Sequence, residues 1–373
     1  MSSAFQYKTT TPENNKDEYN SYDIMDFVIT DVEGMSLVAN SICLHADLQV
    51  NEPSNTRVAA DSSVKVYFNA RTGAHNFFES CSVLTGNQGQ LESNNQYSRY
   101  VNMVECATKD TESRFNTSDV CELKCNSEEL ALGYNKGTIT ATSGTNIVQD
   151  KSFSIKPVCC LTKMSADLPF SKVGFIKLSL SCARADSALY FGGGAGSTMK
   201  YILRNVRLTY QTTPSVAGNT LMRSVMSFTQ NIQSANSSII AKVPGIADSV
   251  SCVFLEAGSE SNPIKNSQQL SRIGNITEVS FHFKDSTNTF VTYPIRDMGE
   301  ITERFVKSVM KTGKNSANSR NWKSNDSFGV GLDFGAYVDL SNQKFTVNIN
   351  TDGGVSATNP YSMNCFFGSM ISL

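Results

Sequence analysis

Hydrophobic and polar residues alternate along much of this chain, and the clearest run lies between residues 330 and 340. Glycine, aspartate and tyrosine separate the apolar side chains of this run, which are Val330, Leu332, Phe334, Ala336, Val338 and Leu340. A period of two places one face of a strand in a core and the opposite face in water. The run therefore predicts a β-strand with one buried and one solvated face.

The same alternation recurs in both halves of the chain. In the first half it predicts strands around residues 42–50, 64–68, 176–182 and 206–210. In the second half it predicts strands around residues 250–254, 279–283, 345–349 and 363–367. Clusters of Gly, Asn, Ser and Asp separate these runs and are typical of turns. Regularly spaced strands without a βαβ rhythm predict an all-β chain built from sandwiches.

Two segments have a helical period instead. Residues 297–311 begin with Asp297 and Glu300, a capping-box-like start, because the Asp297 carboxylate can accept from the amide three residues on. Gly313 supplies a stop, and the apolar stripe between consists of Ile301, Phe305, Val309 and Met310. A weaker helix is expected within residues 95–107, with an apolar face formed by Tyr97, Tyr100, Val101 and Val104.

The length of the chain predicts two domains. At 373 residues it exceeds the size at which a single core stops growing. The break is placed after a strand, at the Pro- and Gly-containing residues 212–218. This gives an N-terminal extended segment (1–35), a first sandwich (36–212) and a second sandwich (213–373). Residues 219–238 are rich in Ser, Asn and Gln and are expected to form a connector across a surface.

Charge and composition limit the partners and the compartment. The net charge is −2, so the chain has no global positive field for nucleic acid, and sequence-specific nucleic acid binding is not expected. No apolar run reaches the length of a membrane-spanning helix. Residues 1–20 are polar and lack the apolar centre of a signal peptide, which predicts synthesis and folding in a reducing compartment. The ten cysteines are then expected as free thiols.

Residues suited to catalysis are sparse. The three histidines, His45, His75 and His282, are expected at the surface, and no His-x-His or Glu-x-x-His pair occurs. No Gly-x-Ser-x-Gly nucleophile elbow is present, and carboxylates such as Glu79 and Glu105 cannot be paired from the sequence. We therefore expect no enzyme, and we assign no catalytic, cofactor-binding or metal-binding residue.

Two motifs invite a ligand site. Cys121 and Cys125 could bind zinc together with Cys159 and Cys160, but their spacing is loose and the second pair is adjacent, so ordinary packing is the favoured reading. The glycine-rich run at 192–200 lacks the glycine and lysine of a phosphate-binding loop at the required positions and precedes a strand. It is typical of a hairpin tip.

The order of several longer segments points to a family. The segments are GAHNFFESCSV from Gly73, GQLE from Gly89, QYSRYVNM from Gln96, KVPGIADSVSCVFL from Lys242, the helix at 297–311, SFGVGLDFGAYVDLSNQKFTVNI from Ser327 and PYSMNCFF from Pro360. In this order and spacing the chain resembles the double jelly-roll major capsid proteins of the tailless-phage and adenovirus lineage. It is most similar to the compact ones of polinton-like viruses and virophages.

This resemblance implies two side-by-side eight-stranded jelly-roll β-sandwiches with short helical insertions. It implies a homotrimer, a pseudo-hexameric capsomer that contacts neighbouring capsomers and tiles an icosahedral shell around a DNA genome. Penton proteins and minor or cement capsid proteins are further implied partners. The chain would be made in the host cytoplasm or virus factory and end in the virion. Contact with an internal membrane stays open and has no support in the sequence, and segment 1–35 is expected at the inner base of the shell.

Two other functions remain as alternatives. A non-catalytic β-sandwich binding module, such as a spike or fibre head or a carbohydrate-binding protein, would need clustered aromatic residues. The lone tryptophan, Trp322, followed by Lys323, is a meagre platform for a sugar. A minor or vertex capsid protein with a single jelly roll would leave half of the chain unexplained. Stoichiometry distinguishes these alternatives from a major shell protein.

Overall fold

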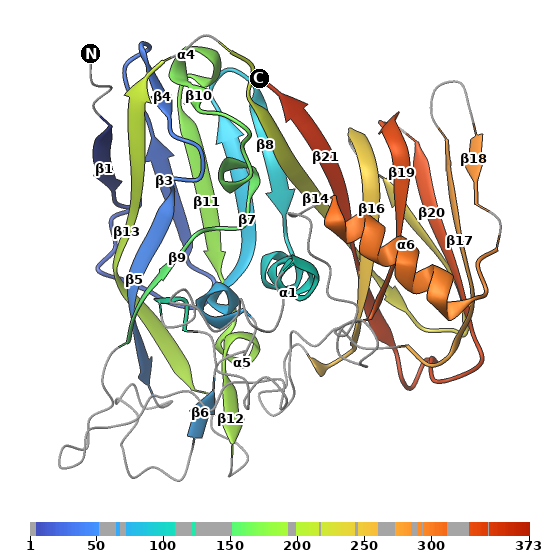
Figure 1. Ribbon diagram of the computed structural model, residues 1–373. Helices are drawn as coiled ribbons and strands as arrows, with labels where there is room; N and C mark the ends of the chain where they lie inside the picture. The colour runs from blue at the N-terminus through green and yellow to red at the C-terminus, as the bar shows by residue number, and fades with distance from the viewer. Residues whose placement is uncertain are drawn as a thin grey trace.

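The computed structural model forms two lobes that stand side by side, with helix α1 between them (Figure 1). Strands up to β13 build the first lobe, and strands from β14 onward build the second. The structure describes residues 5–51, 65–67, 72–108, 121–123, 151–192, 199–215, 218–242, 245–259, 273–284, 289–292, 294–311, 328–341 and 343–373.

The first lobe packs a seven-stranded sheet against four strands of a larger sheet. The seven strands are β1 (Gln6–Thr10), β2 (Glu18–Tyr19), β4 (Met35–Leu37), β5 (Cys43–Asn51), β9 (Lys151–Ile155), β10 (Leu168–Pro169) and β13 (Lys200–Pro214). The four facing strands are β3 (Ile24–Ile29), β7 (Phe78–Thr85), β8 (Gly89–Asn94) and β11 (Ile176–Cys182). The apolar residues of both layers meet in one core, which includes Phe27, Leu44 and Leu178.

Short elements complete the first lobe. Strands β6 (Lys65–Tyr67) and β12 (Tyr190–Gly192) form a two-stranded ribbon that projects from one end. Single helical turns connect the longer strands: η1 (Gly73–Phe77), η3 (Cys160–Thr162), α4 (Phe170–Val173) and α5 (Ala185–Ala188).

The second lobe is a sandwich of four strands on four. One layer consists of β14 (Leu221–Ile232), β16 (Ile246–Glu256), β19 (Gly329–Asp339) and β21 (Tyr361–Ser372). The other consists of β15 (Asn236–Lys242), β17 (Ile276–Lys284), β18 (Thr289–Val291) and β20 (Lys344–Thr351). Phe281, Val347 and Phe367 are among the buried residues between the layers. Among the described residues, these eight strands match the expected count, whereas the first lobe has thirteen strands, several of them only two or three residues long.

One sheet passes through both lobes. Strand β8 of the first lobe lies parallel to β14 of the second, with Ser93 opposite Met226. This pairing joins four strands from each lobe into a single eight-stranded sheet in the order β19-β16-β21-β14-β8-β7-β11-β3. Backbone as well as side chains therefore connects the lobes.

The alternation predicted from the sequence is confirmed in the central strands. In β11 every second residue from Ile176 to Cys182 is buried, and the residues between them are partly exposed. Strand β5 buries Leu44, Ala46 and Leu48 in the same way. Each of these strands is buried mainly on one face because only that face meets the opposite layer.

The N-terminal segment 1–35 was predicted as an extended segment outside the first sandwich, whereas its strands pair with strands of the first lobe. Strand β3 pairs with β11 within the first lobe, and its Met25, Phe27 and Ile29 are fully buried. The segment contains acidic residues such as Asp26, which faces outward and pairs with Lys177 at 2.8 Å. Its polarity therefore reflects the outer face of a strand.

The expected connector at 219–238 is also wrong. Most of it forms β14, which pairs with the C-terminal strand β21 from Leu221 opposite Ser372 to Ile232 opposite Tyr361. Its polar residues have partners on the neighbouring strand, since the Thr229 hydroxyl donates to Asn364 Oδ1 at 2.8 Å. The Ser, Asn and Gln content therefore marks a strand with a polar face.

Helix α6 (Met298–Met310) covers the face of β19 that was predicted to lie in water. A Cβ on Gly331 would lie 2.1 Å from Ser308 Oγ, and a Cβ on Gly329 would lie 2.2 Å from Phe305 Cζ. These glycines therefore allow the helix to approach the sheet. The alternation lapses at Ala336, which is exposed, near a register shift between β16 and β19.

Both predicted helices are present. The Asp297 carboxylate accepts from the Glu300 N–H at 3.0 Å, and Ile301, Phe305 and Val309 are buried. The predicted stop at Gly313 lies outside the described residues. The second helix, α1, covers Tyr97–Thr108. Among the residues described, none of the helices has the length and apolar character needed to cross a membrane.

Candidate functional site: the junction between the lobes

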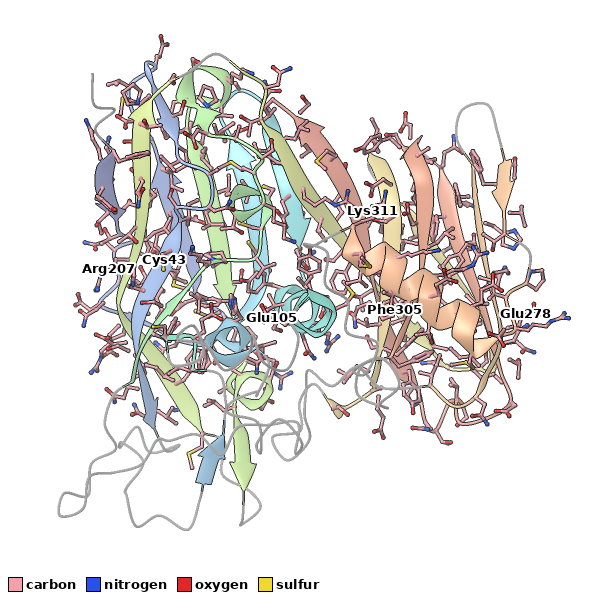
Figure 2. The ribbon with its side chains drawn as sticks, viewed as in Figure 1. Cys43, Glu105, Arg207, Glu278, Phe305 and Lys311 are labelled. Atoms are coloured by element: carbon pink, nitrogen blue, oxygen red, sulfur yellow. The ribbon has the colours of Figure 1, made fainter. Side chains whose placement is uncertain are left out.

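Buried apolar and charged side chains from both lobes meet between the lobes, and we call this region the junction. Its apolar part is a separate buried cluster of Tyr100, Met103, Val104, Val225, Val253, Phe305, Val309 and Phe366. Helix α1 of the first lobe and helix α6 of the second contact each other here. Strands β14, β16 and β21 contribute Val225, Val253 and Phe366 to the same cluster. Phe305 lies at this junction, whereas Arg207 and Glu278 lie at opposite outer sides of the molecule (Figure 2).

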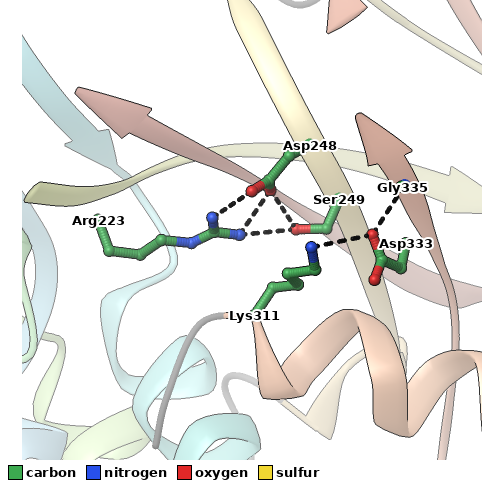
Figure 3. A network of polar contacts seen from close by, with 6 residues as sticks. All are labelled: Arg223, Asp248, Ser249, Lys311, Asp333 and Gly335. Atoms are coloured by element: carbon green, nitrogen blue, oxygen red, sulfur yellow. Dashed lines mark hydrogen bonds and ion pairs between the residues drawn. The ribbon is translucent and has the colours of Figure 1, made fainter. Parts of the chain in front are cut away.

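A buried ion pair crosses the sheet beside this cluster (Figure 3). Arg223 on β14 contacts the Asp248 carboxylate on β16 with both terminal nitrogens, and its Nη2 donates to Asp248 Oδ1 at 2.6 Å. The same nitrogen donates to Ser249 Oγ at 2.9 Å. The guanidinium passes over β21 at Gly368, where a Cβ would lie 2.5 Å from Nη2. Because the charges of Arg223 and Asp248 are buried and in contact, the pair links β14 to β16 across β21, although Arg223 Nε has no hydrogen-bond partner among the described residues.

A second, more exposed contact ties α6 to the sheet. Lys311 Nζ lies 3.4 Å from the Asp333 carboxylate on β19, and the same carboxylate accepts from the Gly335 N–H at 2.9 Å (Figure 3). Gly335 has a positive φ of 70°, a conformation that favours glycine. The helix end is therefore anchored to the point where β19 bends.

On the side of the first lobe, a buried carboxyl faces the junction. Glu92 on β8 is 2% exposed and accepts from the Cys160 N–H. Burial raises the pKa of Glu92 from 4.5 to about 7, although nearby Lys163 and the Cys160 amide oppose the shift. Lys163 Nζ donates to Tyr100 Oη at 2.5 Å. Glu92 is therefore the group of the junction that titrates closest to neutral pH among those with a resolved shift.

The histidines differ from the prediction in one case. His75 is 1% exposed, so the expectation of a surface histidine is wrong there. Its Nδ1 lies 2.8 Å from Tyr97 Oη, which also accepts from the Val158 N–H at 3.0 Å. The sequence GAHNF forms a buried 3₁₀ turn and not an exposed one, because α1 covers it.

The other two histidines are partly exposed, as expected for the polar faces of strands. His45 on β5 bridges its neighbours, with Ser154 Oγ 2.7 Å from Nδ1 and Thr209 Oγ1 2.9 Å from Nε2. Burial lowers the pKa of His45, and Arg207 lowers it further. His282 lies on β17.

The four cysteines considered for zinc are not gathered in the described part of the chain. Cys121 is exposed, Cys159 and Cys160 are buried at η3, and Cys125 lies outside the described residues. The Cys159 thiol is hydrogen-bonded to that of Cys81. Within the described ranges, no group of three or more His, Cys, Asp or Glu side chains is arranged to hold a metal ion.

The glycine-rich run, the lone tryptophan and the isolated basic residues were the remaining candidates. The glycine-rich run at 192–200 lies between strands β12 and β13, and its centre lies outside the described residues, as does Trp322. Arg204, one of the isolated basic residues, is paired with Glu18 on the neighbouring strand. The contacts at the junction, an apolar cluster and a buried ion pair, therefore favour a structural role, which is to hold the two sandwiches together.

Sequence prediction missed Arg223 and Asp248, the central pair of the junction. Each is a charged residue whose immediate neighbours in the strand are buried. A positive charge among buried residues of one strand and a negative charge among buried residues of another could have indicated such a pair, because buried charges are usually paired.

Comparison with solved structures extends over nearly the whole chain. The major capsid protein of Faustovirus matches with a TM-score of 0.59 and 10% identity, over 99% of this chain and 90% of that one. A chain of the Sputnik virophage structure matches with a TM-score of 0.59 and 9% identity, over 99% and 86%. The mavirus major capsid protein matches with a TM-score of 0.50 and 8% identity, over 98% and 88%.

At the level of sequence, no family model and no curated protein matches. The likeness is therefore one of fold, and it includes both lobes and the junction because it covers the chain from end to end. The all-β reading and the resemblance found from ordered segments are confirmed at this level. The chain has the double jelly-roll fold of major capsid proteins.

Proposed function

We propose that this chain is the major capsid protein of an icosahedral virus and ends in the virion. The observation that supports this most is the match of the whole chain, both lobes included, to the Faustovirus major capsid protein. A spike or a vertex protein with one jelly roll would not need two sandwiches joined by a continuous sheet and a buried junction. The rigid junction suits a subunit that must present the same two lobes to every neighbour in a shell.

We further propose that the chain forms a homotrimer with a pseudo-hexameric outline, and that these trimers tile a shell around a DNA genome. The outer ends of the two lobes support it, because both expose apolar side chains. On the first lobe, Tyr7 is 81% exposed on β1, and Phe5 lies beside it. On the second lobe, Val291 is 57% exposed on β18, and Tyr337 is 60% exposed on β19. These two ends lie on opposite sides of the molecule (Figure 1).

An interface between different ends of identical chains repeats head to tail and can close into a ring of three. In the proposed trimer, the end of the first lobe with Tyr7 packs against the end of the second lobe with Val291 of the next copy. Neighbouring capsomers, penton proteins and minor or cement proteins would contact other surfaces. The proposal assigns no catalytic or cofactor-binding residue to the chain.

The test is the native mass of the purified chain by light scattering. A trimer of 40.7-kDa chains has a mass of three times 40.7, or 122.1 kDa, and should persist on dilution. Tyr7→Glu and Val291→Glu should each shift the mass toward the monomer, because each places a charge in the interface. Leu84→Glu, at a 40% exposed position on β7, is the matched control and should leave the trimer intact. A stable monomer of the unaltered chain would contradict the proposal and favour a binding module.

A further inference from the structure

Two cysteines of the second lobe face each other across neighbouring strands. Cys252 on β16 and Cys365 on β21 are direct partners in the antiparallel ladder. Their sulfur atoms are 3.3 Å apart, and both residues are at most 1% exposed. The same ladder continues on both sides of the pair, with Ser251 opposite Phe366 and Val253 opposite Asn364.

This geometry lies within reach of a disulfide. Directly opposed residues of an antiparallel pair have Cα atoms about 4.5–5.5 Å apart, and disulfides tolerate about 4.4–6.8 Å. A sulfur–sulfur bond is about 2.05 Å long, so the two sulfurs need to approach by little more than about 1 Å. Rotation of the side chains supplies most of such a movement, and the strands can keep their register.

We propose that Cys252 and Cys365 are a latent disulfide that closes when the protein passes from a reducing to an oxidising environment. Each sulfur loses its proton, the pair gives up two electrons, and one S–S bond forms. A low-molecular-weight disulfide or azo compound takes up both electrons and both protons. If the proposed capsid function is correct, release of virions from the cell provides this change of environment. The oxidation itself does not depend on that function.

The position of the pair gives the bond a structural effect. Strand β21 ends the chain and lies between β14 and β16, so it holds the centre of one layer. A bond between Cys252 and Cys365 closes a loop of residues 113 apart in sequence. Long closed loops restrict the unfolded chain strongly. The oxidised form should therefore resist unfolding of the second lobe more than the reduced form.

The surroundings also slow the oxidation of this pair. Burial and the neighbouring Cys365 thiol raise the pKa of Cys252 well above its usual value. The thiolate is the reactive form of cysteine, so the buried Cys252 thiol reacts slowly with large thiol reagents. A small oxidant or a transient opening of the strands is needed.

The experiment treats the reduced full-length chain with diamide, a small azo oxidant, and then blocks the remaining thiols with N-ethylmaleimide in denaturant. We expect two fewer blocked thiols, a linked peptide that joins Cys252 to Cys365, and a midpoint of thermal unfolding about 10 °C higher. Dithiothreitol should reverse all three changes. Full blocking of both cysteines after oxidation would overturn the proposal, and so would a link formed only between Cys81 and Cys159.

Two variants complete the test. Cys365→Ala should abolish the linked peptide and the rise in unfolding temperature. Cys182→Ala is the matched control, because Cys182 is equally buried on a strand but has Tyr201 as its hydrogen-bond partner. It should leave both the link and the temperature shift unchanged. Mass mapping of the unaltered chain decides the proposal even if a variant fails to fold, and it is independent of whether the chain forms trimers.

Discussion

The core of the first lobe contains buried tyrosines that need hydrogen-bond partners, whereas the core of the second contains a group of stacked phenylalanines. In the first lobe, Tyr201 Oη donates to the Ala183 carbonyl at 2.5 Å, and Tyr97 bonds to His75 and Val158. In the second lobe, the Phe283 ring lies 4.7 Å from that of Phe334 and 5.7 Å from that of Phe345.

The difference shows that one fold type can be fixed in two physical ways. Hydrogen bonds to buried phenols are directional and specify the position of each group. Ring stacks depend on area and shape, and they are insensitive to pH. The first lobe also buries Glu92, whose pKa burial raises to about 7. We therefore expect the first lobe to respond to pH and the second to respond to loss of volume.

The largest effect is expected from Phe345→Ala in the second lobe. Phe345 is 1% exposed and contacts four rings, those of Phe281, Phe283, Phe334 and Phe367. Removal of a buried Phe costs about 3–5 kcal/mol, and the lost ring contacts place this site near the upper end, about 5 kcal/mol. Urea unfolding monitored by circular dichroism measures the change.

Phe290→Ala is the control for that prediction. Phe290 stacks on Phe283 at 4.9 Å but is 37% exposed at the outer end of the same aromatic stack. Its removal should lower the free energy of unfolding clearly less, because a partly exposed ring buries less apolar area. Equal losses at the two positions would show that the stack does not act as a core.

The ion pair of the junction should give the next largest effect. Arg223→Ala leaves the Asp248 carboxylate buried without its main partner, which typically costs about 3–5 kcal/mol, and we expect about 4 kcal/mol. Arg296→Ala removes an exposed arginine from its pair with Glu278 and should change the free energy of unfolding little. If the two arginines gave equal effects, the junction would not fix the strands as argued.

Much of the fold could be predicted from the sequence, because alternation depends only on which face of a strand is buried. Strand β11 and helix α6 were predicted close to their observed bounds for this reason. The prediction failed where a third layer covers a strand. Gly331 was read as a water-facing residue, and the segment with β14 as a connector, because no local pattern reveals that α6 packs outside the sheet or that β21 pairs with β14.

The candidate site was less predictable than the fold. Arg223 and Asp248 are 25 residues apart and meet only because β14 and β16 flank β21, which ends the chain. His75 was placed at the surface because its neighbours are typical of turns, and its burial depends on α1 and on contacts with Tyr97. Contacts between segments far apart in the sequence determine both the ion pair and the burial of His75, and the local spacing of residues does not reveal such contacts.

The expected pH dependence of the first lobe can be tested at Glu92. The pKa of Glu92 rises from 4.5 to about 7 on folding, so the folded state favours the protonated form. The contribution of Glu92 to stability is therefore greatest below about pH 4.5 and is lost as pH rises to about 7, by an amount on the order of 3 kcal/mol. Glu92→Gln keeps an acceptor for the Cys160 amide and should remove this slope. Thermal unfolding from pH 4.5 to pH 8 measures it.

A matched control belongs in the second lobe. Phe281→Leu alters a buried ring of the aromatic core and no titratable group. Its cost should be the same across that pH range, and the slope due to Glu92 should persist beneath it. A slope that survives Glu92→Gln would mean that another buried group controls the pH response.

The smallest effect is expected at the start of α6, and it shows how tightly the two lobes are coupled. Asp297→Ala removes the acceptor for the Glu300 N–H and should cost about 1 kcal/mol. Lys307→Ala breaks only an exposed pair with Glu303 on the same helix and serves as control. Hydrogen exchange should quicken in the first turn of α6, because the loss is local. If amides of α1 in the first lobe quicken as well, the lobes open as one unit, since α1 and α6 share the apolar cluster of the junction.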